Sequence, residues 1–240
     1  KIKNMKKIIH RAADRGIQDH GWLKAAHSFS FAQYHDPSKV HFGLLRVLND
    51  DIIAPGMGFG THGHENMEIV TIPLKGILAH KDSLGSEGNI TFGEVQVMSA
   101  GSGIRHSEFN GSSTEETSLL QIWVFPKKRN IQPRYDQMRY DLEKTKNSFL
   151  TLVSPKEGEN IMWINQDAFF SMGTFDSGKE SYYNIQHPAN GAYVFVIEGQ
   201  AELDGTLLNT RDAMGVYDID TLEFKFSENS RVLIIEVPMQ

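Results

Sequence analysis

Apolar and polar residues alternate with a period of two along most of the chain. The pattern is clear at residues 42–48, 67–74, 76–79, 93–98 and 119–125, and it returns at 169–175, 191–197, 200–203, 221–226 and 231–237. Glycine, asparagine and aspartate separate these runs, most visibly at 82–89 and at Asn110-Gly111, where the residue types favour hairpin turns. Helical periodicity is poor over the same stretches. The pattern therefore predicts an antiparallel all-β protein.

The character of the chain changes between Pro126 and Phe149. This stretch is rich in charged residues, and the segment 134–144 is its nearest approach to a helix or an extended linker. We therefore expect the domain organisation to be a first domain at 5–132, a linker at 133–148 and a second domain at 149–240.

Four residues with metal-binding side chains occur as two pairs, His62 with His64 and His106 with Glu108. On a strand, residues i and i+2 point to the same side, so each pair presents two donors to one face. If the two strands face each other, three imidazoles and one carboxylate converge. Such groups would each cost about 1–3 kcal/mol if buried without a partner, whereas a divalent cation satisfies them together. The spacing therefore predicts a metal site.

The two halves of the chain look like a diverged repeat. An apolar run ends at Gly76 in the first half and at Gly199 in the second. Two histidines precede the first run, whereas only His187 precedes the second, and residues 211–217 contain no histidine. We expect the second domain to keep the frame of the first without its metal ligands.

The composition restricts the chemistry of the site. The chain of 240 residues contains no cysteine, so a metal must be held by imidazole and oxygen ligands. Its net charge is -6, and its one tight basic cluster, 127–129, is too short for a nucleic-acid footprint. No stretch approaches the roughly 20 apolar residues of a membrane span. We expect a cytoplasmic monomer that binds neither nucleic acid nor membrane.

These residues resemble the motifs of the cupin superfamily. The first motif is matched by Gly56, His62, His64, Glu68 and Gly76, and the second by Gly103, His106 and Asn110. One extra residue precedes the last glycine of the first motif, and Gly101 stands where the second motif usually has proline.

More narrowly, the chain resembles the pirin-like bicupins, in particular their bacterial quercetinase-type branch. The matching segments lie densely in the first half, at 20–23, 27–34, 45–50, 58–64, 67–71, 98–108 and 121–124, and the second half matches only in outline. The resemblance implies an all-β fold of two tandem antiparallel cupin barrels, of the double-stranded β-helix or jelly-roll type, with few short helices.

In that family, the resemblance implies, one iron(II) or similar divalent ion binds the first barrel through three histidines and one glutamate. By position these are His62, His64, His106 and Glu108, and nickel, copper, manganese, cobalt or zinc also suits such ligands. Many other cupins use the glutamate of the first motif, here Glu68, so two carboxylates compete for one role. We expect Glu108 to bind the metal and Glu68 to lie just outside the ligand shell.

The implied reaction is oxidative opening of the heterocycle of a flavonol such as quercetin by O2, with release of carbon monoxide. We expect Glu108 to act as the catalytic base that accepts the proton of the substrate 3-hydroxyl, so that the enolate binds the metal. Two other interpretations stay open: a redox-responsive regulatory protein of the pirin type, and a cupin isomerase or dioxygenase that acts on another phenolic substrate.

The other histidines and the aromatic residues have ordinary explanations. Surface or core roles are expected for His10, His20, His27, His35, His41 and His80. Aromatic residues that alternate in strands usually belong to the core, but seven of them can line a pocket for a flat substrate: Phe29, Phe31, Tyr34, Phe59, Phe92, Phe109 and Trp123.

Overall fold

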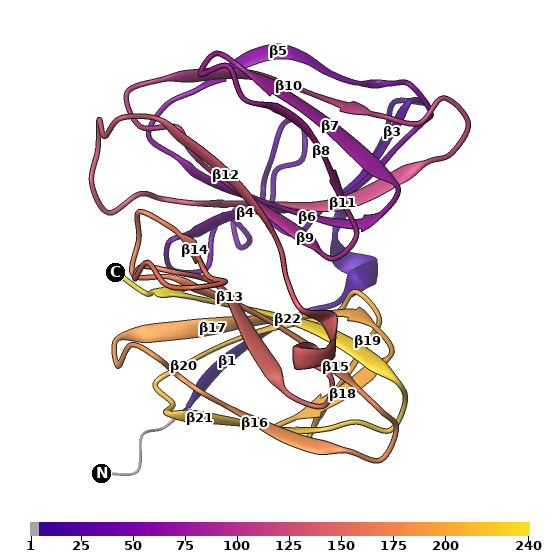
Figure 1. Cartoon of the computed structure of the whole chain (residues 1–240). Helices are drawn as coiled ribbons and strands as arrows, with labels where there is room; N and C mark the ends of the chain where they lie inside the picture. The colour runs from indigo at the N-terminus through magenta and orange to yellow at the C-terminus, as the bar shows by residue number, and fades with distance from the viewer. Residues whose placement is uncertain (1–4) are drawn as a thin grey trace.

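The computed structural model describes residues 5–240, which form two β-barrels, one above the other in Figure 1. Each barrel is built from a seven-stranded sheet and a four-stranded sheet. The pairings between named strands are antiparallel, apart from the parallel pair β13 and β14. The all-β class and the two tandem antiparallel barrels expected from the sequence are confirmed.

The first barrel contains the residues expected at the metal site. Its seven-stranded sheet has the order β12 (Arg134–Arg139), β9 (Glu94–Ser99), β6 (Glu68–Lys75), β11 (Thr117–Val124), β4 (Leu45–Ile53), β3 (Leu23–His27) and β2 (Gly16–Asp19). Its four-stranded sheet has the order β5 (Gly58–His64), β10 (Ile104–Asn110), β7 (Ile77–Asp82) and β8 (Glu87–Thr91).

The second barrel repeats this arrangement. Its seven-stranded sheet has the order β1 (Lys6–His10), β20 (Ala213–Tyr217), β17 (Asn190–Glu198), β22 (Ser230–Pro238), β15 (Phe169–Phe175), β13 (Phe149–Ser154) and β14 (Met162–Trp163). Its four-stranded sheet has the order β16 (Glu180–Asn184), β21 (Thr221–Lys225), β18 (Gln200–Leu203) and β19 (Thr206–Asn209). Two short 3-10 helices complete the described chain, η1 (Ala12–Asp14) and η2 (Leu142–Thr145).

The two seven-stranded sheets pack against each other, and the main hydrophobic core lies between them. Because side chains alternate along a strand, Leu48 of β4 and Ile122 of β11 project toward the second barrel. They share this core with Phe170 of β15 and Phe195 of β17. The opposite faces of β4 and β11 therefore turn into the first barrel, where the site lies.

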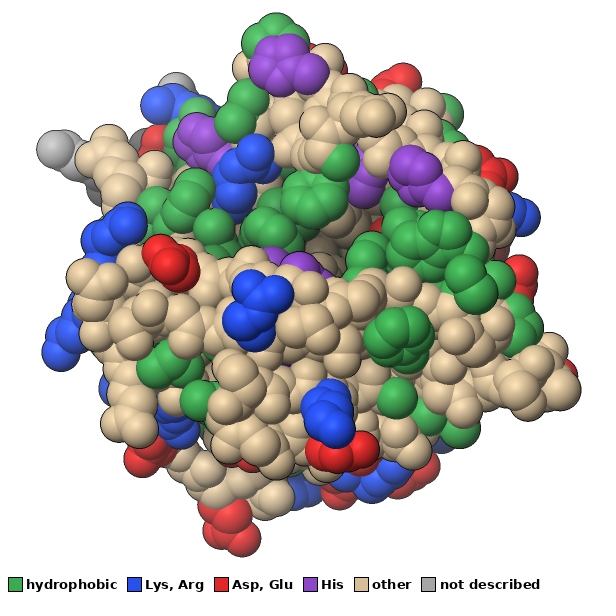
Figure 2. All heavy atoms as spheres, turned by 90° about the horizontal axis from the view of Figure 1, so that it is seen from above, with side chains coloured by type: hydrophobic (Ala, Val, Ile, Leu, Met, Phe, Trp, Pro, Cys, Tyr) green, Lys and Arg blue, Asp and Glu red, His purple; other side chains and the backbone are tan. Residues whose placement is uncertain are grey.

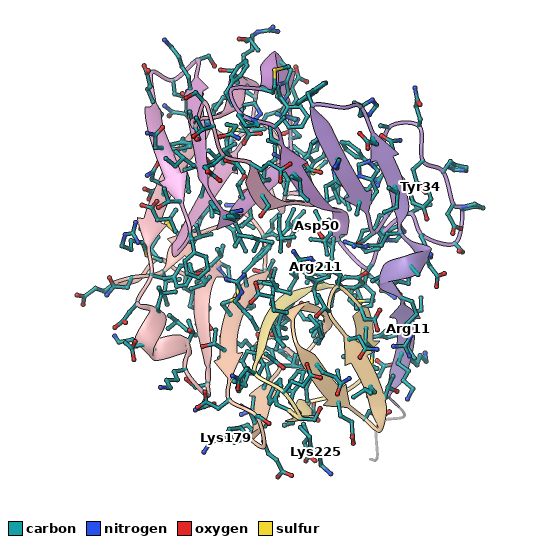
Figure 3. All side chains as sticks on the ribbon, turned by 90° about the vertical axis from the view of Figure 1, so that its right-hand side faces the viewer. Arg11, Tyr34, Asp50, Lys179, Arg211 and Lys225 are labelled. Atoms are coloured by element: carbon teal, nitrogen blue, oxygen red, sulfur yellow. The ribbon has the colours of Figure 1, made fainter. Side chains whose placement is uncertain are left out.

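An ion cluster connects the two barrels beside this core. Asp50 of β4 accepts hydrogen bonds from Arg15 Nη1 at 2.9 Å and from Arg211 Nε at 2.8 Å. Figure 3 shows Asp50 and Arg211 at the junction of the barrels. The cluster ties the segment before β2 and the loop before β20 to one carboxylate.

Strand pairing crosses the domain boundaries that the sequence predicts. The boundaries themselves remain a prediction. Strand β1 pairs with β20 of the second barrel, although it precedes the whole first barrel in the chain. Strand β12, within the segment expected to be a linker, pairs with β9 of the first barrel. Among residues 5–240, no helix has the length and apolar character needed to cross a membrane.

Candidate metal centre

The two predicted pairs of donors lie on neighbouring strands of one sheet, not on strands that face each other. Strands β5 and β10 are antiparallel, with His106 opposite His62 and Ile104 opposite His64. The pairing shifts register between His106 and Glu108, yet both side chains are buried on the inner side of β10. Each pair therefore presents its side chains to one face, as the alternation predicts. The histidines come together because the two strands lie side by side.

The three histidines meet through one nitrogen each. His106 Nε2 lies 3.0 Å from His64 Nε2 and 3.0 Å from His62 Nε2. The Nδ1 atom of His62 donates to the backbone oxygen of Gly60 at 2.8 Å, so its Nε2 carries the lone pair that faces the cluster. A backbone carbonyl thus selects the tautomer that binds a metal.

The electrostatics of the cluster favour neutral imidazoles. Burial, together with His62, lowers the pKa of His64 to about 4. Burial, together with His62, His64 and His80, lowers the pKa of His106 to about 3. Neutral rings are the form that binds a cation, so the site is prepared to take one without losing protons from these two residues.

The spacing of the nitrogens also fits a cation. One proton cannot form hydrogen bonds to three nitrogen atoms at these distances. The three Nε2 atoms lie close enough together to share one ion. Two of the nitrogen–nitrogen distances are 3.0 Å, which would let one divalent ion contact these nitrogens together. The residues present therefore fit a divalent ion held by imidazole nitrogens.

Glu108 is a buried carboxyl group two residues from His106 on β10. Its Oε2 accepts a hydrogen bond from Gln121 Nε2 at 2.8 Å, while its buried Oε1 has no hydrogen-bond partner among the described residues. Burial raises the pKa of Glu108 to about 7, against the opposing effect of Gln121. Donor atoms of Glu108, His106 and His80 lie within 4.8 Å of one another, and this group shares only His106 with the group formed by His62, His64 and His106.

Glu68, the competing carboxyl, lies elsewhere. Its Oε2 accepts hydrogen bonds from Ser99 Oγ at 2.8 Å and from the backbone nitrogen of Asn165 at 3.1 Å. It belongs to neither group of clustered metal-type donors within the described chain. Glu68 therefore connects the first barrel to the loop between β14 and β15 of the second barrel.

His80 is a site residue that the sequence did not single out. It is buried on β7, opposite Glu108 of β10, and its Nε2 lies 2.7 Å from Asp82 Oδ2. Its ring stacks on Tyr135 at 4.2 Å between centroids. The i, i+2 spacing of His80 and Asp82 was the available signal, because it puts both side chains on one face of a strand.

A cavity of about 390 Å³ opens onto the cluster. Figure 2 shows this hollow from above, with apolar side chains around its mouth and histidines at its edge. His62, His64 and Glu108 line it together with Phe31, Phe59 and Trp123, and also Trp22, which was not expected there. Of the other aromatic candidates, Phe29 is buried between the barrels, whereas Phe92 and Phe109 are exposed.

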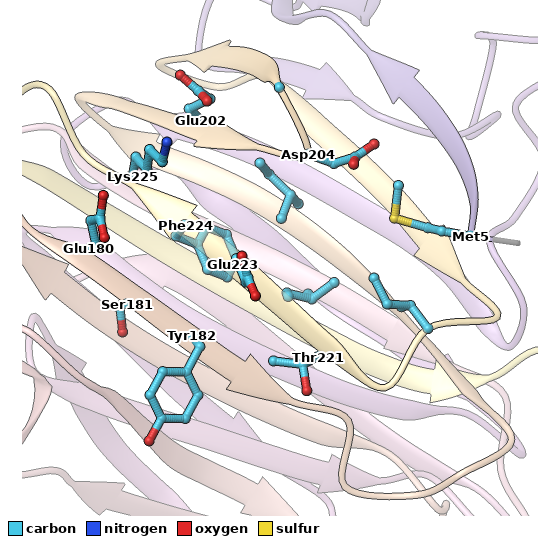
Figure 4. A pocket seen from close by; sticks show the side chains of 14 residues that line it. Met5, Glu180, Ser181, Tyr182, Glu202, Asp204, Thr221, Glu223, Phe224 and Lys225 are labelled. Atoms are coloured by element: carbon cyan, nitrogen blue, oxygen red, sulfur yellow. The ribbon is translucent and has the colours of Figure 1, made fainter. Parts of the chain in front are cut away.

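A larger hollow, of about 670 Å³, lies on the four-stranded sheet of the second barrel. Figure 4 shows its charged rim, which includes Glu180, Glu223 and Lys225, and the side chain of Tyr182. Among the described residues, no histidine lines this hollow. The interior behind this sheet is filled by aromatic rings such as Phe175 and Phe226, which stack at 4.0 Å between centroids.

Two stacked barrels, with three histidines and a carboxyl group clustered beside an apolar cavity in one of them, define a bicupin with a candidate metal centre. The pirin family model matches residues 10–124, and a quercetinase C-terminal cupin model matches residues 151–237. The chain belongs to the pirin family.

Relatives cover nearly the whole chain. A quercetin 2,3-dioxygenase from Escherichia coli K12 is 38% identical over 230 residues, which span 96% of this chain and 98% of that protein. A pirin-like protein from Caulobacter vibrioides is 38% identical over 222 residues, which span 92% and 95%.

Solved structures agree with this assignment. YhhW from Escherichia coli superposes with a TM-score of 0.92 at 37% identity, covering 97% of this chain and 98% of that chain. The bacterial pirin YhhW in complex with nickel(II), from the same organism, gives a TM-score of 0.91 at 36% identity, with coverage of 97% and 99%.

Proposed function

We propose that this protein is a metal-dependent dioxygenase that opens the heterocycle of a flavonol such as quercetin with O2 and releases carbon monoxide. The observation that carries the proposal is the cluster of three histidines, with buried Glu108 next to His106, at a cavity of about 390 Å³ that is lined largely by apolar and aromatic side chains. The names of the relatives support the choice of flavonol.

The proposed ligands are His62, His64 and His106 through Nε2, and Glu108 through its unpaired Oε1. Iron(II) is the proposed ion, although nickel, copper, manganese, cobalt or zinc would also suit nitrogen and oxygen donors. The solved complex of bacterial pirin with nickel(II) supports a divalent ion in this family. When bound, the ion acidifies and holds a substrate oxygen and provides a position for O2.

Glu108 is the proposed base. Gln121 holds one of its oxygens, and Trp123 Nε1 in turn donates to Gln121 Oε1 at 3.3 Å, so the carboxyl is held in a fixed orientation. Burial alone raises the pKa of this carboxyl to about 7, and a cation at Oε1 would lower it, which favours the carboxylate that can accept the phenolic proton at Oε2. Trp22, Phe59 and Trp123 exclude water from the flat substrate while the proton moves.

The reaction balances with O2 as the only co-substrate. The 3-hydroxyl proton goes to Glu108 and returns to the product. Both atoms of O2 enter the products, two ring bonds break, and one ring carbon leaves as carbon monoxide. A phenolic ester remains.

Elemental analysis followed by anaerobic titration with quercetin tests the proposal. We expect one divalent ion per chain, a shifted flavonol absorption band without O2, and carbon monoxide after O2 is admitted. His62→Ala should lose metal and turnover together. Full metal occupancy in that variant would refute the ligand assignment, and absence of carbon monoxide with metal-loaded protein would refute the reaction.

A further inference from the structure

Two buried polar side chains in the cavity have no part in the scheme above. His27 of β3 and Asp51 of β4 are each 3% exposed, and both line the cavity that contains His62 and His64. His27 pairs with Asn49 across the two strands, and Asp51 follows Asn49 by two residues, so both face the barrel interior. They lie on the seven-stranded sheet, whereas the three clustered histidines lie on the four-stranded sheet.

His27 presents a hydrogen-bond acceptor at this wall. Its Nδ1 lies 2.7 Å from Asn49 Oδ1, and an amide oxygen only accepts, so Nδ1 carries the hydrogen. Burial lowers the pKa of His27, which keeps the ring neutral. Its buried Nε2 is therefore a lone-pair acceptor, and within the described chain it has no partner.

Asp51 offers a second acceptor on the same face. Its buried Oδ1 has no hydrogen-bond partner in the part of the chain that the structure describes. Leu23, Ala25 and Phe59 line the same cavity, and Asn49 and Gln121 are the polar neighbours on this wall. Buried polar atoms are normally paired, so these two open acceptors suit a molecule in the cavity that brings its own donors.

We propose that His27 and Asp51 form a hydroxyl subsite, which binds the phenolic hydroxyl groups of a polyhydroxylated aromatic substrate. The proposal rests on the proposed function and names its substrate class more closely. Hydroxyl groups are the matching donors, because both open atoms accept hydrogen bonds and a carboxyl oxygen accepts in either ionisation state. A substrate held by metal on one sheet and by hydroxyls on the other has a single orientation.

The test compares quercetin with 3-hydroxyflavone, which shares the metal-binding oxygens and lacks the other hydroxyl groups. Dissociation constants are measured anaerobically on the metal-loaded full chain from the shift of the flavonol absorption band, so no turnover is required. We expect the wild type to bind quercetin at least tenfold more tightly than 3-hydroxyflavone. A ratio near one would overturn the hydroxyl subsite while leaving the proposed function intact; failure of both ligands to bind would overturn both.

Variants of the two residues test whether they cause the preference for quercetin over 3-hydroxyflavone. Asp51→Leu and His27→Leu should each reduce the quercetin to 3-hydroxyflavone preference by about fivefold or more, since each removes one acceptor. Asp51→Asn and His27→Gln retain an acceptor oxygen and should keep most of the preference for quercetin. A residue with only a structural role would not give this difference between its two variants. His35→Leu, at an exposed histidine outside the cavity, is the matched control. An unchanged ratio in both leucine variants, with metal content preserved, would overturn the assignment.

Discussion

At the scale of single residues, Glu108 can be tested apart from the histidines. Glu108→Gln keeps the volume of the side chain and an oxygen that can bind metal, but it removes the base. We expect metal to be retained and the rate of flavonol opening to fall by about 10²–10⁴-fold, the usual contribution of a general base. Metal analysis and oxygen consumption, measured on the same preparation, check this. Unaltered turnover would remove Glu108 from the mechanism.

Glu68 provides a contrasting prediction, because it is buried without touching the cluster. Burial raises its pKa to about 7, so the folded protein binds this proton more tightly than the unfolded chain does. The stabilising contribution is complete below about pH 4.5 and is lost as the pH rises through 7.

Glu68→Gln removes this dependence while the amide oxygen still accepts from Ser99 and Asn165. The variant should equal the wild type near pH 4 and exceed its free energy of unfolding by about 1–3 kcal/mol at pH 8. Urea unfolding at both pH values measures the difference, with metal content and turnover as controls. A difference that stays constant with pH would contradict the prediction.

Sequence spacing predicted some site residues and not others for a physical reason. His62, His64 and His106 could be found because i, i+2 alternation is a local property of a strand. Gln121 and His80 come close to Glu108 only through the pairing of distant strands, which no local pattern encodes. The choice between Glu68 and Glu108 likewise depends on where each carboxyl points in the folded chain: Glu68 contacts Asn165 of the second barrel, whereas Glu108 lines the cavity.

At the scale of elements, the close approach of β5 to β10 determines the site. A Cβ atom on Gly58 would overlap the backbone oxygen of Glu108 and the backbone of Phe109. Gly58→Ala should therefore force the strands apart, lower the free energy of unfolding by about 1–3 kcal/mol and weaken metal binding.

Gly60→Ala on the same strand is the matched control for this variant. Nothing lies within 4 Å of the position that its Cβ would occupy, so we expect a change within about 0.5 kcal/mol. Thermal unfolding and calorimetric metal titration compare the two variants. Equal metal affinities would show that the approach of β5 to β10 does not control the site.

The strands themselves were predictable where apolar residues were frequent between clear turn residues. Residues 169–175 and 200–203 match β15 and β18, and the run at 191–197 lies within β17. The segment 134–144 was expected to be a helix or linker, but it contains β12 followed by the start of η2. This strand is half-exposed at a sheet edge, where polar residues obscure the alternation and pairing with β9 supplies the missing stabilisation.

At the scale of the whole molecule, the two barrels differ in what fills them. The inner face of the first barrel carries a row of polar residues on adjacent strands, formed by His27, Asn49, Gln121, Thr71 and Gln96. The second barrel is filled by one apolar cluster that includes Phe224 and Phe226. A barrel with polar residues and a cavity inside it gains less from its own interior, so the apolar core that it shares with the second barrel matters more to its stability.

The ion cluster at the junction tests this dependence. Asp50→Ala leaves Arg15 and Arg211 partly buried without their carboxylate, which should lower the free energy of unfolding by about 2–4 kcal/mol. Asp218→Ala breaks the exposed pair with Lys6 and should cost at most about 1 kcal/mol. The core between the barrels is common to both, so urea unfolding monitored by fluorescence and by metal release should give the same midpoint. In Asp50→Ala this midpoint should move to a lower urea concentration. Two separate midpoints, or equal effects of the two variants, would show that the barrels do not stabilise each other through this junction.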